Sequence, residues 1–212
     1  MKRLLTIAGL TALCAAPATA QFLGMPVWNS PKGGTGITIS GDMGLPSAEA
    51  GKGTAFGGRA TLGFANIAIT AGVSTWTPEA ANEAISSFGG GAAFRVIGGS
   101  LMPVAINLIV GAARSSETAI NPATTNIVAG AGVSAGLPTP GISIEPYISL
   151  TNRWAAASGF DTDSRFGVTF GANLGFGLFG VHLAYDTASK NGSSASVFGV
   201  GAHVSLRAPL GM

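Results

Sequence analysis

Hydrophobic residues alternate with small or polar residues along most of the chain. In residues 166–176, large apolar side chains recur at every second position, with glycine, threonine or asparagine between them. Because alternate side chains of a β-strand point to opposite faces, this pattern predicts strands with one oily and one small or polar face. The same alternation is present at residues 67–74, 142–151 and 179–186. No segment after residue 20 has the roughly twenty apolar residues that a transmembrane helix needs.

The alternation predicts about ten strands, most of them about ten residues long, which is the length of a tilted strand that crosses a bilayer. The expected strands are residues 36–43, 54–64, 66–76, 90–99, 103–113, 125–137, 141–152, 164–176, 178–187 and 196–207. The connections alternate between short turns and longer loops, the latter at 44–53, 77–89, 114–124, 153–163 and 188–195. This organisation is typical of an antiparallel up-and-down transmembrane β-barrel with short periplasmic turns and longer extracellular loops. Eight strands remain an alternative if the 36–43 segment or one other weak strand does not join the barrel.

The composition favours lipid over water as the surroundings of the outer face. Charged residues make up 9% of the chain, hydrophobic residues 47%, and there are 33 glycines, whereas a soluble domain has about 25% charged residues. Most charges fall in the expected long loops, at Glu49, Lys52, Glu79, Glu83, Arg114, Glu117, Arg153, Asp161, Asp163 and Lys190. Aromatic residues, Trp76 among them, fall near both ends of the strands, so we expect an aromatic girdle at each membrane interface.

The first twenty residues have the pattern of a cleavable signal peptide. Lys2 and Arg3 precede an apolar stretch, and Ala18-Thr19-Ala20 fits a small-x-small cleavage site, so we expect Sec-type export and a mature chain that starts near Gln21. Removal of this segment leaves nine of the eleven basic residues against nine acidic ones, a balance that gives no reason to expect nucleic-acid binding. The single cysteine also leaves with the signal, so no intrachain disulfide is expected.

Residues 35–207 resemble the small outer-membrane β-barrel proteins of Gram-negative bacteria. Residues 201–206 of the last expected strand are similar to the glycine-x-x-apolar-x-apolar signal of that class, although the chain ends on residues 207–212 without a terminal aromatic. The resemblance implies an outer-membrane location, with membrane lipid and the barrel-assembly machinery as partners. We therefore divide the chain into a signal peptide (1–20), a periplasmic N-terminal segment (21–34), a transmembrane barrel (35–207) and a C-terminal tail (208–212). The oligomeric state and the subfamily stay open.

Several polar residues fall in the inward phase of the strands at similar depth, and they predict a polar layer in the lumen. The members of this layer are Arg59, Arg95, Asn107, Glu145, Tyr147, His182 and His203. We expect Glu145 to pair with one of the two arginines, because an unpaired charge in a confined lumen is costly. Such a layer either closes and stabilises the barrel or forms a constriction that selects solutes.

The sequence predicts no catalytic residue, no metal site and no cofactor. Gly132-Val133-Ser134-Ala135-Gly136 matches the nucleophile-elbow pattern of hydrolases but lies within an alternating strand, where that turn cannot form. Two histidines without a third ligand make a poor zinc site. We therefore expect no enzyme but a narrow passive pore, porin-like, for small solutes or ions. The alternatives are a closed-lumen structural or surface-interaction barrel and, less favoured, a membrane-embedded hydrolase or acyltransferase.

Overall fold

The computed structural model describes residues 21–81, 83–98, 102–118 and 122–207. The expected signal peptide (1–20) and C-terminal tail (208–212) lie outside the described residues. In the part of the chain that the structure describes, no helix combines the length and the apolar character needed to cross a membrane.

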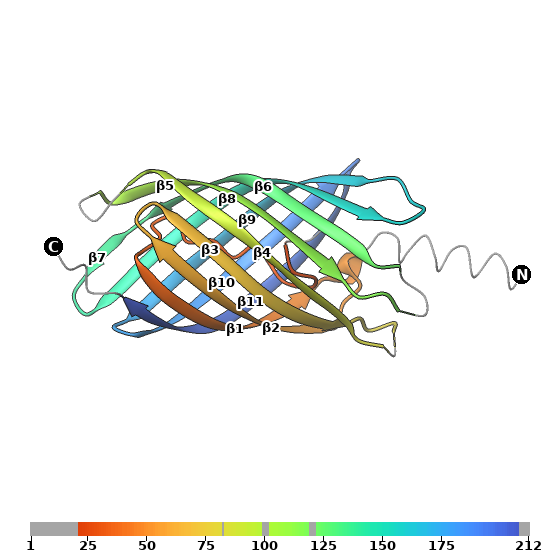
Figure 1. Cartoon of the computed structure of the whole chain (residues 1–212), viewed down its shortest axis with the longest axis horizontal. Helices are drawn as coiled ribbons and strands as arrows, with labels where there is room; N and C mark the ends of the chain where they lie inside the picture. The colour runs from red at the N-terminus through yellow and green to blue at the C-terminus, as the bar shows by residue number, and fades with distance from the viewer. Residues whose placement is uncertain (1–20, 82, 99–101, 119–121, 208–212) are drawn as a thin grey trace, which may run out of the picture.

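Ten antiparallel strands form a closed barrel (Figure 1). They are β1 (Gly36–Pro46), β2 (Thr54–Phe64), β3 (Ile67–Thr77), β4 (Ile85–Ile97), β5 (Val104–Ser115), β6 (Thr124–Ala135), β8 (Ile142–Ala157), β9 (Asp163–Phe176), β10 (Phe179–Lys190) and β11 (Ser193–Arg207). The barrel closes where β1 pairs with β11, from Gly36 opposite Arg207 to Pro46 opposite Val197. The predicted barrel is confirmed with ten strands, and the first segment is a full member of the wall.

Two short elements stand outside this wall. Strand β7 (Leu137–Thr139) pairs with the beginning of β8 and forms a small hairpin beyond the barrel edge. The 3₁₀ helix η1 (Ala48–Ala50) lies in the connection between β1 and β2. Neither element enters the barrel closure, which runs from β6 directly to β8.

The connections define two ends of the barrel. We call the end with residues 65–66, 98, 102–103, 136–141 and 177–178 the turn end. The end with residues 47–53, 78–81, 83–84, 116–118, 122–123, 158–162 and 191–192 is the loop end. The prediction of a long loop at 188–195 is wrong, because β10 and β11 continue until only Asn191 and Gly192 join them. Both residues have positive φ (49° and 81°), the conformation with which an Asn-Gly pair ties a tight hairpin.

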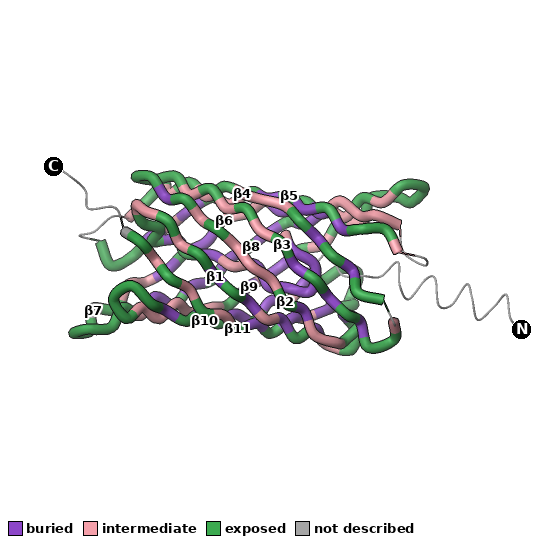
Figure 2. The backbone as a smooth tube through the Cα atoms, turned by 60° about the horizontal axis from the view of Figure 1, so that its bottom comes forward, coloured by how far each residue is buried: buried purple, intermediate pink, exposed green. Residues whose placement is uncertain are grey.

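The outer face is apolar, as the alternation predicts, and buried residues lie mainly towards the loop-end half (Figure 2). Phe64 and Phe179 are 73% and 65% exposed at the turn end, and Phe88 is 64% exposed near the loop end. Trp76 was expected in the outer girdle, and this is wrong. It is 4% exposed, and its indole Nε1 donates a hydrogen bond of 2.9 Å to the carbonyl of Lys52.

Candidate functional site

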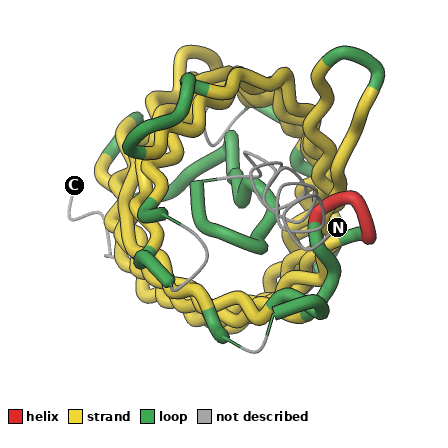
Figure 3. Tube along the Cα trace, turned by 90° about the vertical axis from the view of Figure 1, so that its right-hand side faces the viewer, coloured by secondary structure: helices red, strands yellow, loops and turns green. Residues whose placement is uncertain are grey.

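The N-terminal segment, residues 21–35, lies inside the barrel. Figure 3 looks along the barrel and shows this coil enclosed by the ring of strands. The chain reverses at the loop end through a turn in which the Met25 N–H donates to the Phe22 carbonyl at 3.1 Å. Gly24 has φ +72° there, and a Cβ atom on it would lie 2.6 Å from the Cβ of Ala55, so only glycine fits. Residues 21–34, expected as a periplasmic segment, thus lie within the lumen.

Apolar contacts hold the reversed part of the segment in place. Phe22, Leu23 and Met25 are at most 7% exposed and pack with wall residues that also point into the lumen. These wall residues are Ala55, Trp76, Ile85 and Ala113. The loop-end half of the lumen thus has a small hydrophobic core, in which burial of each large side chain contributes about 1.5–3 kcal/mol.

Polar contacts fix the middle of the segment to the wall. Asn29 and Asn107 of β5 exchange two amide hydrogen bonds of 3.2 and 2.8 Å, and both side chains are buried. The Asn29 amide nitrogen also donates to the hydroxyl of Ser149 in β8 at 2.9 Å. Because each of these groups is removed from water, the pairing satisfies polar atoms that would otherwise be costly to bury.

Glu145 of β8 binds the N-terminal segment at Ser30 and Lys32, just after Asn29. Its carboxylate accepts hydrogen bonds from the Ser30 hydroxyl at 2.9 Å and from the Lys32 N–H at 2.8 Å. Ser134 and Asn173 donate to the same carboxylate from the neighbouring strands, at 2.7 and 3.2 Å. The expected pair between Glu145 and an arginine is not formed among the described residues. Four neutral donors satisfy the carboxylate in place of a cation.

A charged network lies across the lumen from Glu145. Arg59 makes a two-pronged contact with Asp42, at 2.6 and 3.2 Å, and Asp42 also accepts from His182 Nε2 at 2.7 Å. Nδ1 of His182 lies 3.1 Å from Nδ1 of His203, so one of these nitrogens donates and the other accepts. Trp28 of the N-terminal segment packs edge-on to His182 at 4.6 Å and lies under the Arg59 guanidinium at 5.3 Å.

A second buried ion pair lies nearer the loop end. Arg153 of β8 makes two hydrogen bonds to Asp186 of β10, at 2.8 and 2.6 Å, and Thr169 donates to the same carboxylate. The two side chains are 2% and 0% exposed. Arg153 was expected in a loop, and this is wrong, because β8 continues to Ala157 and keeps Arg153 in the inward phase.

The seven residues predicted as one polar layer take separate roles. Arg59, His182 and His203 share the network with Asp42, whereas Asn107 and Glu145 bind the N-terminal segment. Arg95 lies at the turn end, where its guanidinium donates to the carbonyls of Lys32 and Ala65 and to the Asn66 side chain. Tyr147 is buried with its ring against Gly171. Sequence reasoning missed Asp42, Trp28, Asn29 and Asp186 as lumen-site residues. Of these, Asp42 and Asp186 lie in expected strands with an inward phase.

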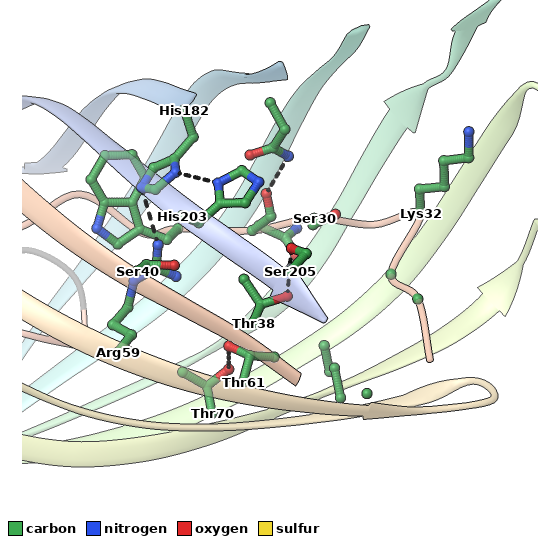
Figure 4. A pocket seen from close by; sticks show the side chains of 18 of the residues that line it. Ser30, Lys32, Thr38, Ser40, Arg59, Thr61, Thr70, His182, His203 and Ser205 are labelled. Atoms are coloured by element: carbon green, nitrogen blue, oxygen red, sulfur yellow. Dashed lines mark hydrogen bonds between the residues drawn. The ribbon is translucent and has the colours of Figure 1, made fainter. Parts of the chain in front are cut away.

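A cavity of about 940 Å³ fills the turn-end half of the lumen (Figure 4). The N-terminal segment forms one side of it, through Trp28, Ser30 and Lys32. Strands β1, β2, β3 and β11 form the opposite side, and Arg59, His182 and His203 lie at its inner end. Among the described residues, no group of three or more histidine, cysteine, aspartate or glutamate side chains is placed to hold a metal ion.

Comparisons with solved structures agree with this architecture. The β domain of the Bordetella autotransporter BrkA matches over 81% of this chain and all of that chain, with a TM-score of 0.52 and 12% identity. The chain has the fold of the outer-membrane β-barrel proteins. Lower similarity is found to a bacterial polysaccharide outer membrane secretin (TM-score 0.47, 13% identity, 82% of this chain), of which the chain spans 65%. The N-terminal barrel domain of Pseudomonas aeruginosa OprF also matches (TM-score 0.41, 9% identity, 82% and 99% of the two chains).

No protein-family model and no curated protein sequence matches this barrel. The three solved structures named above share only 9–13% of their residues with it. What the barrel does must therefore be argued from its lumen.

Proposed function

We propose that this protein is an outer-membrane barrel whose own N-terminal segment closes the lumen, and that displacement of this segment opens a narrow passage for small solutes or ions. The observation that carries the proposal is the position of Phe22, Leu23 and Met25, which are buried against inward-facing wall residues in the loop-end half of the lumen. The open cavity at the turn end supports it, since the lumen is wide enough for solutes wherever the segment does not fill it.

The outer face supports a membrane location. Large apolar side chains stand exposed along the strands, and phenylalanines are exposed near both ends of the barrel. Such a band suits contact with lipid acyl chains and excludes a stable position in water. The partners we infer are membrane lipid and, during biogenesis, the barrel-assembly machinery, which would read the β11 stretch 201–206. The inferred role needs no catalysis.

The proposal is tested by conductance of the purified protein in a planar bilayer. Wild type should be silent or open only briefly, and a variant lacking residues 22–29 should conduct steadily. Glu145→Ala keeps the chain length while it removes the acceptor for Ser30 and Lys32, and it should increase the frequency of openings. Steady conductance of wild type would instead identify a permanently open pore and refute closure.

A closed structural barrel is the second candidate. The buried Arg153–Asp186 pair favours it, because this pair spans from β8 to β10 within the lumen and would remain after the segment left. If the variant lacking residues 22–29 is folded but silent, this candidate is preferred, and the function then lies on the outer surface or in the loops.

A further inference from the structure

Four hydroxyl groups form a continuous row along one wall of the turn-end cavity. Ser205 stands opposite Thr38, Thr38 opposite Thr61, and Thr61 opposite Thr70, so the row crosses β11, β1, β2 and β3. Thr38 and Ser205 are hydrogen bonded at 2.9 Å, and Thr61 and Thr70 at 2.8 Å. All four residues line the cavity (Figure 4).

This row can bind further polar groups. A hydroxyl group has one donor and two acceptor sites, so a pair of hydroxyls that share one hydrogen bond keeps one donor and several acceptor sites free. The four side chains are only partly buried, which leaves these sites open towards the cavity. A wall of this kind fits the hydroxyl groups of a ligand, since each can both donate and accept.

Two cations stand at the rim of the same cavity. Lys32 and Arg95 both line it, and neither forms an ion pair with any described residue. The guanidinium of Arg95 is held by neutral acceptors, and its Nε is buried without a hydrogen-bond partner among the described residues. Lys32 is exposed. The rim therefore carries positive charge that is free to attract an anion.

The carboxylates of this part of the lumen are already engaged. Asp42 is paired with Arg59 and His182, and Glu145 accepts four hydrogen bonds from neutral donors. Both are at most 8% exposed. A ligand in the cavity thus meets hydroxyl groups along one side and cations at the rim, while the acidic side chains are withdrawn into the wall.

We propose that the turn-end cavity binds a small organic anion that carries several hydroxyl groups. Its carboxylate or phosphate lies at Lys32 and Arg95, and its hydroxyl groups lie along the row from Ser205 to Thr70. The volume of about 940 Å³ is suitable for a ligand of this size, since small-molecule sites span about 300–1,000 Å³. Because Lys32 belongs to the N-terminal segment, the site is complete with the segment in place, and ligand binding does not require the lumen to open.

The test is isothermal titration calorimetry on the purified full chain with defined probes. Gluconate and glucose 6-phosphate present the two possible anionic groups, glucose presents the hydroxyl groups without charge, and acetate presents charge without hydroxyl groups. At least one of the first two should bind tenfold or more tightly than both glucose and acetate. Which of them binds identifies the anionic group, and equal binding of glucose would refute the role of charge.

Variants separate the two halves of the site. Lys32→Gln should weaken binding about tenfold, the size of a charge-assisted hydrogen bond, whereas Lys32→Arg should retain it. Thr61→Val should weaken binding without affecting the charge, because valine keeps the shape and removes the hydroxyl. Lys52→Gln is the matched control, since Lys52 lies at the loop end and is paired with Glu79 at 3.1 Å.

The Lys32 variants are the most informative, because the Lys32 side chain forms no ion pair with another described residue, so its substitution breaks no such contact. Failure of all four probes to bind folded wild type would overturn the inference, as would undiminished binding by Lys32→Gln. Neither result touches the proposed closure of the lumen, which the conductance of the variant lacking residues 22–29 tests separately.

Discussion

Replacement of Asn29 by alanine should loosen the N-terminal segment from the lumen wall about 100-fold. Asn29 makes three side-chain hydrogen bonds, two with Asn107 and one with Ser149. At about 1 kcal/mol each, their loss costs about 3 kcal/mol, and each 1.4 kcal/mol changes an equilibrium about tenfold. Asn107→Ala removes two of the same bonds, so it should loosen the segment by about 2 kcal/mol. The double variant should differ little from Asn29→Ala alone.

Undocking can be measured by the rate at which a buried thiol is modified. Val27 is 6% exposed in the lumen, and cysteine is close to valine in size, so Val27→Cys in a Cys14→Ser background reports departure of the segment. When reclosing is faster than modification, the rate with a water-soluble methanethiosulfonate reagent is proportional to the undocked fraction. Asn152→Ala is the control, because Asn152 lies on the outer face of β8.

Rates that rise less than about threefold in Asn29→Ala would refute this account, since they correspond to less than about 0.7 kcal/mol. Additive effects of the two asparagine substitutions would also contradict it. The amide pair predicts strong non-additivity, because either substitution alone removes both mutual bonds.

Two further perturbations test other parts of the lumen. Arg153→Met should lower the free energy of unfolding in urea by about 3–5 kcal/mol, because it leaves Asp186 buried and unpaired. The control Lys190→Met breaks an exposed pair and should cost less than about 1 kcal/mol. Equal effects of the two substitutions would show that burial of the Arg153–Asp186 pair is unimportant. Gly199→Ala would place a Cβ atom 2.6 Å from the proline ring of the segment, so it should raise the thiol-modification rate roughly tenfold through a cost of about 1–3 kcal/mol. Gly41→Ala, which meets no atom within 4 Å, should leave that rate unchanged, and an equal rise in both would contradict a specific contact.

The wall of the barrel could be predicted from the sequence because it obeys a local rule. The phase of each strand follows from residues two apart, and that phase correctly turns Glu145 and Arg59 inward. The same rule, applied with longer strands, would have found Arg153, which continues the inward series of β8. Asp42 was also within reach, since it alternates with Thr38 and Ser40 in an expected strand. Strand ends depend on long-range pairing, and the two-residue turn after β10 extended the ladder beyond the expected boundary.

The contents of the lumen could not be predicted in this way. Residues 21–35 have no period, and Pro26 and Pro31 exclude a regular strand there. Their position follows from contacts with residues far along the chain, such as Asn107 and Ser149. The available signal was the apolar character of Phe22, Leu23 and Met25, which is unusual for a segment exposed to water. The roles of Asn107 and Glu145 depend on that segment, so their partners were missed as well.

The seam between β1 and β11 constrains the order in which this protein can assemble. It joins residues far apart in the sequence, such as Thr38 and Ser205. Bringing them together costs loop-closure entropy, and we expect this cost to be offset only after the intervening strands have formed. Residue 35 leads directly into β1, and the preceding residues must therefore be enclosed as the seam closes or threaded into a finished cylinder. The first route is simpler, because an open sheet presents Asn107 and Glu145 on an accessible surface. Residues 21–35 would then bind to the open sheet first, and β1 and β11 would pair around them.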